Sequence, residues 1–110
     1  MLLRDLELGA IQVHILYHAI QHPVYGSWMV EELARHGLMI SYGTLYPMLH
    51  RMSDAGLLTC REQREGSQMR KYYTATQEGR QEMAHIQHLV RELYQEVVEQ
   101  VPSVIEGEEA

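Results

Sequence analysis

Hydroxyl-bearing and cationic side chains are concentrated between residues 41 and 51, in the segment SYGTLYPMLHR. The hydroxyl groups of Ser41, Thr44 and Tyr46 can bind phosphate oxygens or the edges of bases. If the segment is helical, its first free N–H groups also attract phosphate. The other candidates here, two that could contact a thymine methyl group and two with nitrogen donors, are Tyr42, Pro47, His50 and Arg51. This pattern favours a surface that binds nucleic acid.

A second group of polar side chains follows in a stretch with the period of a β-hairpin. Its candidates for phosphate contact are Arg64, Gln68, Arg70 and Lys71. Successive strand residues point to opposite faces, so Arg70 and Lys71 would reach one ligand together only if the ribbon twists. The alternative interpretation is that these charges are a solvated strand edge.

The charge distribution separates this region from the rest of the chain. The protein has 110 residues and a net charge of −6, which alone argues against a nucleic-acid partner. Residues 35–75, however, contain six Lys or Arg against three Asp or Glu, whereas the remainder contains three against twelve. Because a local basic surface matters more than the overall sum for phosphate binding, any such contact is expected in the middle of the chain.

Histidines form another group with possible chemistry. Seven are present, and the spacings of His14 with His18 and of His85 with His88 place each pair on one helical face. Such pairs can hold a transition metal, and imidazoles also respond to pH near neutrality. No cysteine or carboxylate motif completes a ligand set, so a polar surface is the simpler interpretation and no cofactor is expected.

Several functional classes find no support. A P-loop, a G-x-G-x-x-G loop, an H-E-x-x-H motif and a nucleophile elbow are all absent, so we do not expect an enzyme. Cys60 has no partner for an internal disulfide, and its place beside Leu58 in the strand pattern predicts a small core residue. No apolar run could span a membrane, and the segment MLLRDLELGA is unlike a secretory signal, so a cytoplasmic protein is expected.

The apolar pattern predicts the elements that must position these groups. Spacings of three and four predict helices over residues 5–21, 26–36 and 42–54, and alternation predicts strands over 57–64 and 69–75. Ser41 and Thr76 are expected helix caps, and Pro47 is tolerable because it falls near a first turn. The expected inner stripe of the first helix is Leu6, Ala10, Val13, Tyr17 and Ile20, widened by Leu8, Ile11, Ile15 and Leu16. That of the third is Leu45, Leu49 and Met52, with Met48 beside it.

The last predicted helix, over residues 77–101, carries a heptad-like seam. Its apolar positions are Met83, Ile86, Leu89, Val90, Leu93 and Val97. So long a helix cannot be covered by the small domain before it, and we expect burial against a second copy. The predicted organisation is a DNA-binding unit over 1–75, a dimerisation helix over 76–106 packed with the first helix, and a disordered tail over 107–110. The fold class is mainly α with a small β-hairpin, a winged helix-turn-helix plus a long C-terminal dimerisation helix.

Three motifs resemble the PadR family of transcriptional regulators. The run SYGTLYPMLHRM from Ser41, followed by Ala55-Gly56-Leu57-Leu58, is similar to the signature S-x-G-T-L-Y-P-x-L-x-R-L…x-G-L. Tyr25-Gly26 is similar to the family's Y-G at the start of the second helix. Arg70-Lys71-Tyr72-Tyr73, with Thr76 and Gly79, resembles R-K-Y-Y-x-x-T-x-x-G. The chain looks like the compact branch with a single C-terminal helix.

The resemblance implies a homodimeric regulator, most often a repressor, that binds a palindromic operator in double-stranded DNA and is released by a small-molecule or metal effector. The matching positions that would contact DNA are Tyr25 with Gly26, Ser41, Gly43, Thr44, Tyr46, Pro47, Arg70 and Lys71. Two alternatives stay open. One is a winged-helix module for protein interaction, and the other is a metal-responsive regulator that uses histidines of the first and last helices.

Overall fold

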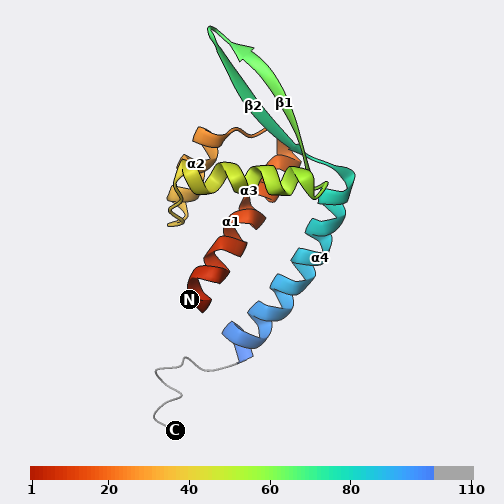
Figure 1. Cartoon of the computed structure of the whole chain (residues 1–110). Coiled ribbons are helices and arrows are strands. Elements are labelled where there is room, and N and C mark those ends of the chain that lie inside the picture. The colour runs from red at the N-terminus through yellow and green to blue at the C-terminus, as the bar shows by residue number, and fades with distance from the viewer. Residues whose placement is uncertain (101–110) are drawn as a thin grey trace.

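The computed structural model describes residues 1–100, which fold into helices that surround one core and a hairpin that projects from it (Figure 1). The elements in chain order are α1 (Leu2–Gln21), α2 (Gly26–Arg35), α3 (Tyr42–Asp54), β1 (Leu58–Glu65), β2 (Gln68–Ala75), α4 (Gln77–Tyr94) and a terminal π-helical stretch η1 (Gln95–Gln100). The predicted order and fold class, a winged helix-turn-helix followed by a long helix, are confirmed. The predicted helix end at Val101 and the predicted tail over 107–110 lie outside the described residues.

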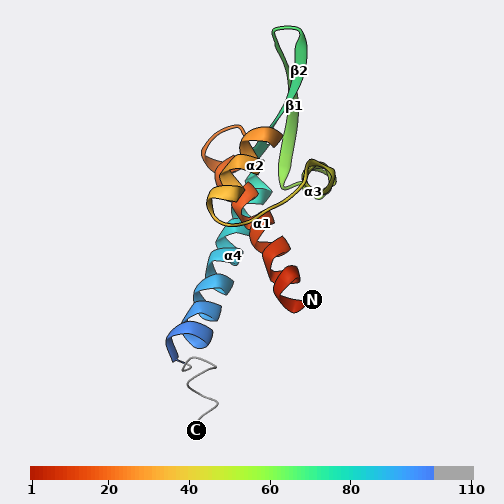
Figure 2. The same cartoon turned by 90° about the vertical axis from the view of Figure 1, so that its left-hand side faces the viewer.

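The hairpin and the pair α1 and α4 extend to opposite sides of α3. Both views place the hairpin beyond one side of α3, while α1 and α4 run beside each other on the other side (Figures 1 and 2). The molecule therefore has a hairpin end and a helical end, with α3 between them.

The helix caps are those that the sequence predicts. The Ser41 hydroxyl accepts a hydrogen bond from the Thr44 N–H at 3.3 Å, and Thr76 Oγ1 accepts one from the Gly79 N–H at 2.9 Å. Each cap satisfies one of the free N–H groups of a helix start. Gly37 follows α2 with a φ of 76°, a left-handed conformation that suits glycine at a helix end.

The core is built from one face of each helix. In α3 the predicted inner residues Leu45, Met48, Leu49 and Met52 are all buried. In α1 the predicted main stripe is wrong at Leu6 and Tyr17, which are 58% and 48% exposed, whereas Val13 and Ile20 are partly buried against the core. The residues that α1 does bury are the flanking ones, Ile11, Ile15 and Leu16, together with Ala19. Both sides of α1 are apolar in sequence, and packing against α2, β2 and α4 selects between them.

The strand β1 leaves the core almost as soon as it begins. Leu58 is buried, whereas every later residue of β1 is exposed. Cys60 is therefore exposed, and the prediction that it is a core residue is wrong. Its cross-strand partner Tyr73 is buried, because Val24 pairs with β2 and leaves β1 at the edge, and strand alternation could not indicate which of the two strands is covered. Gly66, with a φ of 63°, forms the turn.

A pair of backbone hydrogen bonds that the sequence did not reveal ties the hairpin to the segment before α2. The Val24 N–H donates to the Tyr73 carbonyl at 2.9 Å, and the Tyr73 N–H donates to the Val24 carbonyl at 2.8 Å. Val24 and Tyr73 are both buried. The base of the hairpin is thus held against the start of α2.

Pro47 lies in the second turn of α3 and not near the first. It is the sixth residue of the helix, whose bounds are those predicted. Its missing N–H leaves the Gly43 carbonyl without the usual helical donor, and Gly43 has no side chain to add to the crowding. The helix continues past this position because the four buried residues of its inner face anchor it in the core.

The helix α4 changes its surroundings along its length. Gly79 and Met83 are buried against the core, and Ile86 is partly buried. From Gln87 to Gln100 every residue is exposed, including the seam residues Leu89, Val90, Leu93 and Val97. Met83, predicted in a partner interface, is covered by its own chain. Among residues 1–100, each helix is too short or too polar to cross a membrane.

Replacement of Gly79 by alanine should destabilise the fold. A Cβ at this position would overlap the Leu57 carbonyl oxygen and would lie 3.1 Å from Leu16 Cδ1. Backbone cannot move aside as a flexible side chain can, so we expect a loss of about 1–3 kcal/mol in the free energy of unfolding. Urea denaturation followed by circular dichroism, at one fixed protein concentration, measures it.

Gly9→Ala is the matched control. Gly9 is also helical, but nothing lies within 4 Å of an added Cβ. This variant should gain up to about 1 kcal/mol from helix propensity. Equal stability of Gly79→Ala and the parent protein would contradict the packing argument.

Candidate nucleic-acid interface

The outer face of α3 is polar and accessible. While its inner residues are buried, Tyr42 and Tyr46 are 47% and 45% exposed. Their rings are stacked, with 5.9 Å between the ring centres. The other predicted contact residues on α3 or at its cap are all exposed: Ser41, Gly43, Thr44, Pro47, His50 and Arg51. The helix therefore presents hydroxyl, imidazole and guanidinium groups on a surface anchored from beneath.

A groove of about 790 Å³ lies between the start of α2, the middle of α3 and the strand β2. It brings together eight of the fourteen predicted contact residues, namely Tyr25, Gly26, Tyr46, Pro47, His50, Gln68, Arg70 and Lys71. Ser27, Met69 and Tyr73 also line it and were not predicted. Tyr73 belongs to a motif that the sequence shows, whereas Ser27 and Met69 carry no charge and no motif position, so only the fold could have identified those two.

The wall of the groove depends on a glycine. A Cβ at Gly26 would lie 2.6 Å from the Tyr46 hydroxyl oxygen and 2.8 Å from the ring carbon beside it. The absence of a side chain lets the Tyr46 ring lie directly over the first residue of α2. Tyr73 lines the same groove, and burial, followed by the neighbouring Cys60, raises the pKa of Tyr73 to about 12. Its hydroxyl therefore stays protonated at neutral pH.

Both cationic residues of β2 border the groove. Arg70 and Lys71 are neighbours in the strand, so their side chains leave opposite faces of the ribbon at the edge of this groove. The Arg70 guanidinium lies 4.2 Å above the centre of the Tyr25 ring, a cation–π contact. Arg70 Nη1 is also 3.7 Å from Glu65 Oε1.

Six predicted contact residues do not line the groove. Ser41, Tyr42, Gly43 and Thr44 lie at the N-terminal end of α3, where the Ser41 hydroxyl donates to Thr44 Oγ1 at 3.2 Å. Arg51 and Arg64 are exposed on α3 and near the tip of the hairpin. His50, which does line the groove, is 3.4 Å from Asp54.

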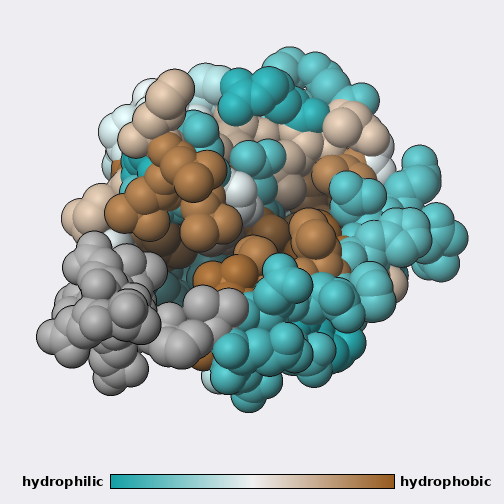
Figure 3. All heavy atoms as spheres, turned by 90° about the horizontal axis from the view of Figure 1, so that it is seen from below, coloured by the Kyte–Doolittle hydropathy of each residue, from teal (hydrophilic) through white to brown (hydrophobic). Residues whose placement is uncertain are grey.

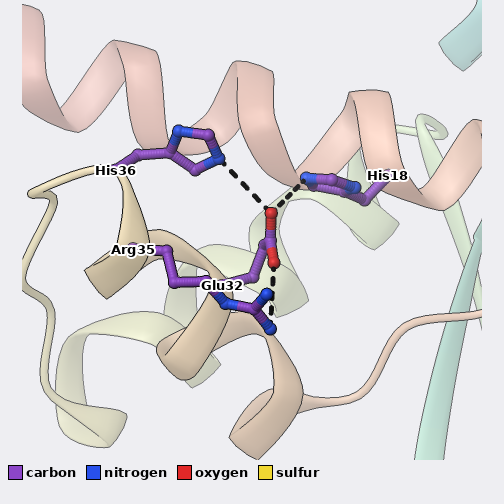
Figure 4. A network of polar contacts seen from close by, with 4 residues as sticks. All are labelled: His18, Glu32, Arg35 and His36. Carbon is purple, nitrogen blue, oxygen red and sulfur yellow. Dashed lines mark hydrogen bonds and ion pairs between the residues drawn. The ribbon is translucent and has the colours of Figure 1, made fainter.

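A second cluster of titratable groups lies at the helical end. His18 Nε2 and His36 Nε2 are 3.6 and 3.3 Å from the same oxygen of Glu32, while Arg35 is 3.5 Å from its other oxygen (Figure 4). The His14 ring lies 4.7 Å from that of His36. Burial lowers the pKa of His14 and of His18, and the neighbouring imidazoles lower both further, whereas Glu32 opposes the shift.

The predicted metal candidates are not assembled within one chain. His14 and His18 lie near His36 and Glu32. His85 and His88 are exposed on α4 and do not line the groove between α1 and α4 that His14, His18 and His36 border. In the part of the chain that the structure describes, no three side chains of His, Cys, Asp or Glu are arranged to hold a metal ion. His36 and Glu32 come from α2 and its end, so the spacing of histidines in α1 could not have indicated them.

The same imidazoles border a groove of about 820 Å³ between α1 and α4. Its lining combines His14, His18 and His36 with Val13, Tyr17, Met83, Ile86, Gln87, Val90, Arg91 and Tyr94. Seen from below, this end of the molecule shows hydrophobic side chains gathered among hydrophilic ones (Figure 3). An apolar groove with a few polar groups at one side can take a small molecule or a partner surface.

Comparison with known proteins agrees with this architecture. The model of the transcriptional regulator PadR-like family matches residues 15–85. The transcriptional regulator Rv3488 of Mycobacterium tuberculosis is 38% identical over 96 residues, which cover 87% of this chain and 90% of the relative.

Solved structures lead to the same group. A PadR family transcriptional regulator from Eggerthella lenta superposes with a TM-score of 0.80 at 30% identity, covering 93% of this chain and 90% of the other. Bacillus subtilis PadR in complex with operator DNA is similar in fold, with a TM-score of 0.63 at 22% identity over 69% of this chain and 44% of that one.

The histidine cluster predicts a loss of stability in mild acid. Because burial lowers the pKa of His14 and His18 below the ordinary value of 6.5, the unfolded chain takes up protons first as the pH falls. The contribution of these two histidines to stability is complete above pH 6.5 and is lost as the pH falls from 6.5 toward their lowered pKa in the folded state. The melting temperature should therefore decrease between about pH 7.5 and about pH 5.5.

His18→Gln should make the melting temperature depend less on pH over this range. His88→Gln, at an exposed site of α4 outside the cluster, is the control and should leave the dependence as it is. A pH profile of His18→Gln as steep as that of the parent protein would contradict this assignment.

Proposed function

The chain belongs to the PadR-like family of transcriptional regulators, and from this membership we propose that it binds double-stranded operator DNA as a homodimer. The observation that carries the proposal is the groove that joins Tyr46 of α3 to Arg70 and Lys71 of β2. In winged helix-turn-helix proteins the third helix enters the major groove while the hairpin reaches the adjacent backbone. One polar helix and two cations beside it suit that arrangement.

Phosphate contacts would supply most of the affinity. The candidates for backbone contact are Arg64, Arg70, Lys71 and the free N–H groups at the start of α3, and the chain's positive charge is concentrated in the same region. Base edges would be read by the outward side chains of α3, with Thr44, Tyr46, His50 and Arg51 as candidates. The overall charge of −6 does not oppose this, because the acids lie mainly outside residues 35–75.

The exposed seam of α4 and η1 supports the dimer. Leu89, Val90, Leu93 and Val97 are each between 48% and 65% exposed, and together they form one apolar stripe along the helix. A second copy packed along this stripe would bury it and would leave both α3 helices free. Two such helices spaced about 34–36 Å apart would meet successive major grooves of a palindromic site. Residues 1–75 would then be the DNA-binding unit and α4 with α1 the dimerisation unit.

Regulation would follow from the same arrangement. We place the release of a repressor in the groove between α1 and α4, since α4 sets how the two halves are held. An effector bound there shifts the equilibrium only if it prefers one geometry of the dimer over the other. The imidazoles and the apolar wall would accept a small molecule with both polar and apolar parts.

Tyr46→Ala tests the DNA-contact assignment. The ring lines the groove and is 45% exposed, so its loss should weaken binding to a selected duplex by about tenfold or more while the fold is kept. A gel-shift titration against a duplex selected from a random pool measures it. Tyr46→Phe keeps the ring over Gly26 and removes only the hydroxyl, which separates packing from hydrogen bonding. Unchanged affinity of Tyr46→Ala would count against the assignment.

Leu93→Glu tests the dimer. A carboxylate in the centre of the apolar stripe would have to be buried without a partner, so the variant should sediment as a monomer in analytical ultracentrifugation. Gln81→Glu, exposed on the same helix and outside the stripe, should leave the dimer intact. A dimeric profile for Leu93→Glu would place the interface elsewhere.

A further inference from the structure

We propose that Glu65 acts as an internal substitute for a DNA phosphate, holding Arg70 and Tyr72 in the free protein and giving them up when DNA binds. The inference rests on the proposed function, and it concerns a residue that no motif marked. Glu65 is the last residue of β1, next to the turn at Gly66.

A single carboxylate oxygen receives both groups. The Tyr72 hydroxyl donates to Glu65 Oε1 at 3.0 Å, and Arg70 Nη1 lies 3.7 Å from the same oxygen. Glu65 pairs with Gln68 across the hairpin, so Arg70 and Tyr72 lie two and four residues along the same face of β2. The twist of the ribbon and the length of the side chains bring the Glu65 carboxylate, the Arg70 guanidinium and the Tyr72 hydroxyl together on one face.

The cluster is continuous with the groove. The Arg70 guanidinium lies over the Tyr25 ring at 4.2 Å, and the Tyr72 ring meets Tyr25 edge-on at 5.5 Å. Tyr25 immediately precedes α2 and lines the groove beside Tyr46. Glu65 therefore orients the very guanidinium that the proposed function assigns to the DNA backbone, and in that sense it is a positioning residue.

The chemistry of the carboxylate explains why it would exchange with phosphate. Both anions accept parallel hydrogen bonds from a guanidinium, and phosphate carries charge over more oxygens. The side chains of Arg70 and Glu65 are 38% and 39% exposed, so water screens their attraction and the pair adds little to folding. A phosphate that approaches Arg70 also repels Glu65, which can turn away into solvent from its position beside the turn.

This exchange would lower affinity for any duplex and weaken non-specific contacts most. In the free protein Glu65 offsets the charge of Arg70, so loose encounters with DNA gain little from that cation. Only a complex that places a phosphate within reach of Arg70 recovers the interaction. Removal of the carboxylate charge should therefore strengthen binding to all duplexes and should reduce the ratio between selected and shuffled sequences.

Glu65→Gln is the test, with fluorescence anisotropy on a selected duplex and on a shuffled duplex of the same length. We expect about two- to fivefold tighter binding, larger for the shuffled duplex. The slope of log affinity against log salt should steepen by about one counterion, because Arg70 then acts as a full cation toward DNA. Circular dichroism and melting temperature should match those of the parent protein.

Two controls isolate the contact from general charge. Glu62→Gln removes the same charge from the same strand, at an exposed residue opposite Lys71 that makes no hydrogen bond or ion pair of its side chain within residues 1–100. Its effect should be smaller. In an Arg70→Gln background, Glu65→Gln should have no more effect than Glu62→Gln, since the cation to be released is gone.

The outcomes separate the two proposals. Equal gains from Glu65→Gln and Glu62→Gln, a gain that persists without Arg70, or weaker binding of Glu65→Gln would overturn the role of Glu65 and leave DNA binding intact. Failure of the parent protein to bind any selected duplex would overturn the proposed function, and the role of Glu65 with it.

Discussion

The two hydrogen bonds between Val24 and Tyr73 determine how the hairpin stands relative to the helices. They fix Val24, and the two residues that follow it border the groove. Val24 holds the base of the hairpin, Tyr25 presents its ring to Arg70, and Gly26 leaves space for the ring of Tyr46. Without this pairing β2 would lose its backbone connection to the segment before α2, and the cations of β2 would be less firmly positioned beside α3. The groove is thus a consequence of one short backbone contact between segments distant in sequence.

The parts of the fold that the sequence predicted are those set by local chemistry. Ser41 and Thr76 cap helices because their hydroxyls satisfy nearby N–H groups, and the buried stripe of α3 follows from its spacing. The errors concern choices that only packing makes. In α1 two apolar sides compete, and the neighbours of the helix decide between Leu6 and Tyr17 on one side and Ile11 and Leu16 on the other. For Cys60 the face was predicted, but only tertiary structure determines that β2, with the buried Tyr73, is covered while β1 is exposed.

The candidate site divides in the same way. Motif residues such as Tyr46, Arg70 and Lys71 could be named in advance because their side chains carry the relevant chemistry. Met69 and Ser27 join the groove only through its shape, and Glu32 joins His18 and His36 through the approach of α1 and α2. Contacts between segments far apart in the chain leave no periodic signal in a single sequence. The sequence therefore predicts more of the hairpin end, where motif residues carry the chemistry, than of the helical end, where contacts between distant segments do.

The exposure of Cys60 has a practical consequence for observing such a protein in solution. As the one thiol in the sequence, exposed on the strand β1, it offers a unique attachment point for a fluorophore or a spin label. In an assembly of two copies each hairpin would carry one probe, and the distance between the probes would report directly how far apart the wings are held. The distance between the two hairpins, which we propose that effector and operator set differently, could then be measured without an engineered cysteine.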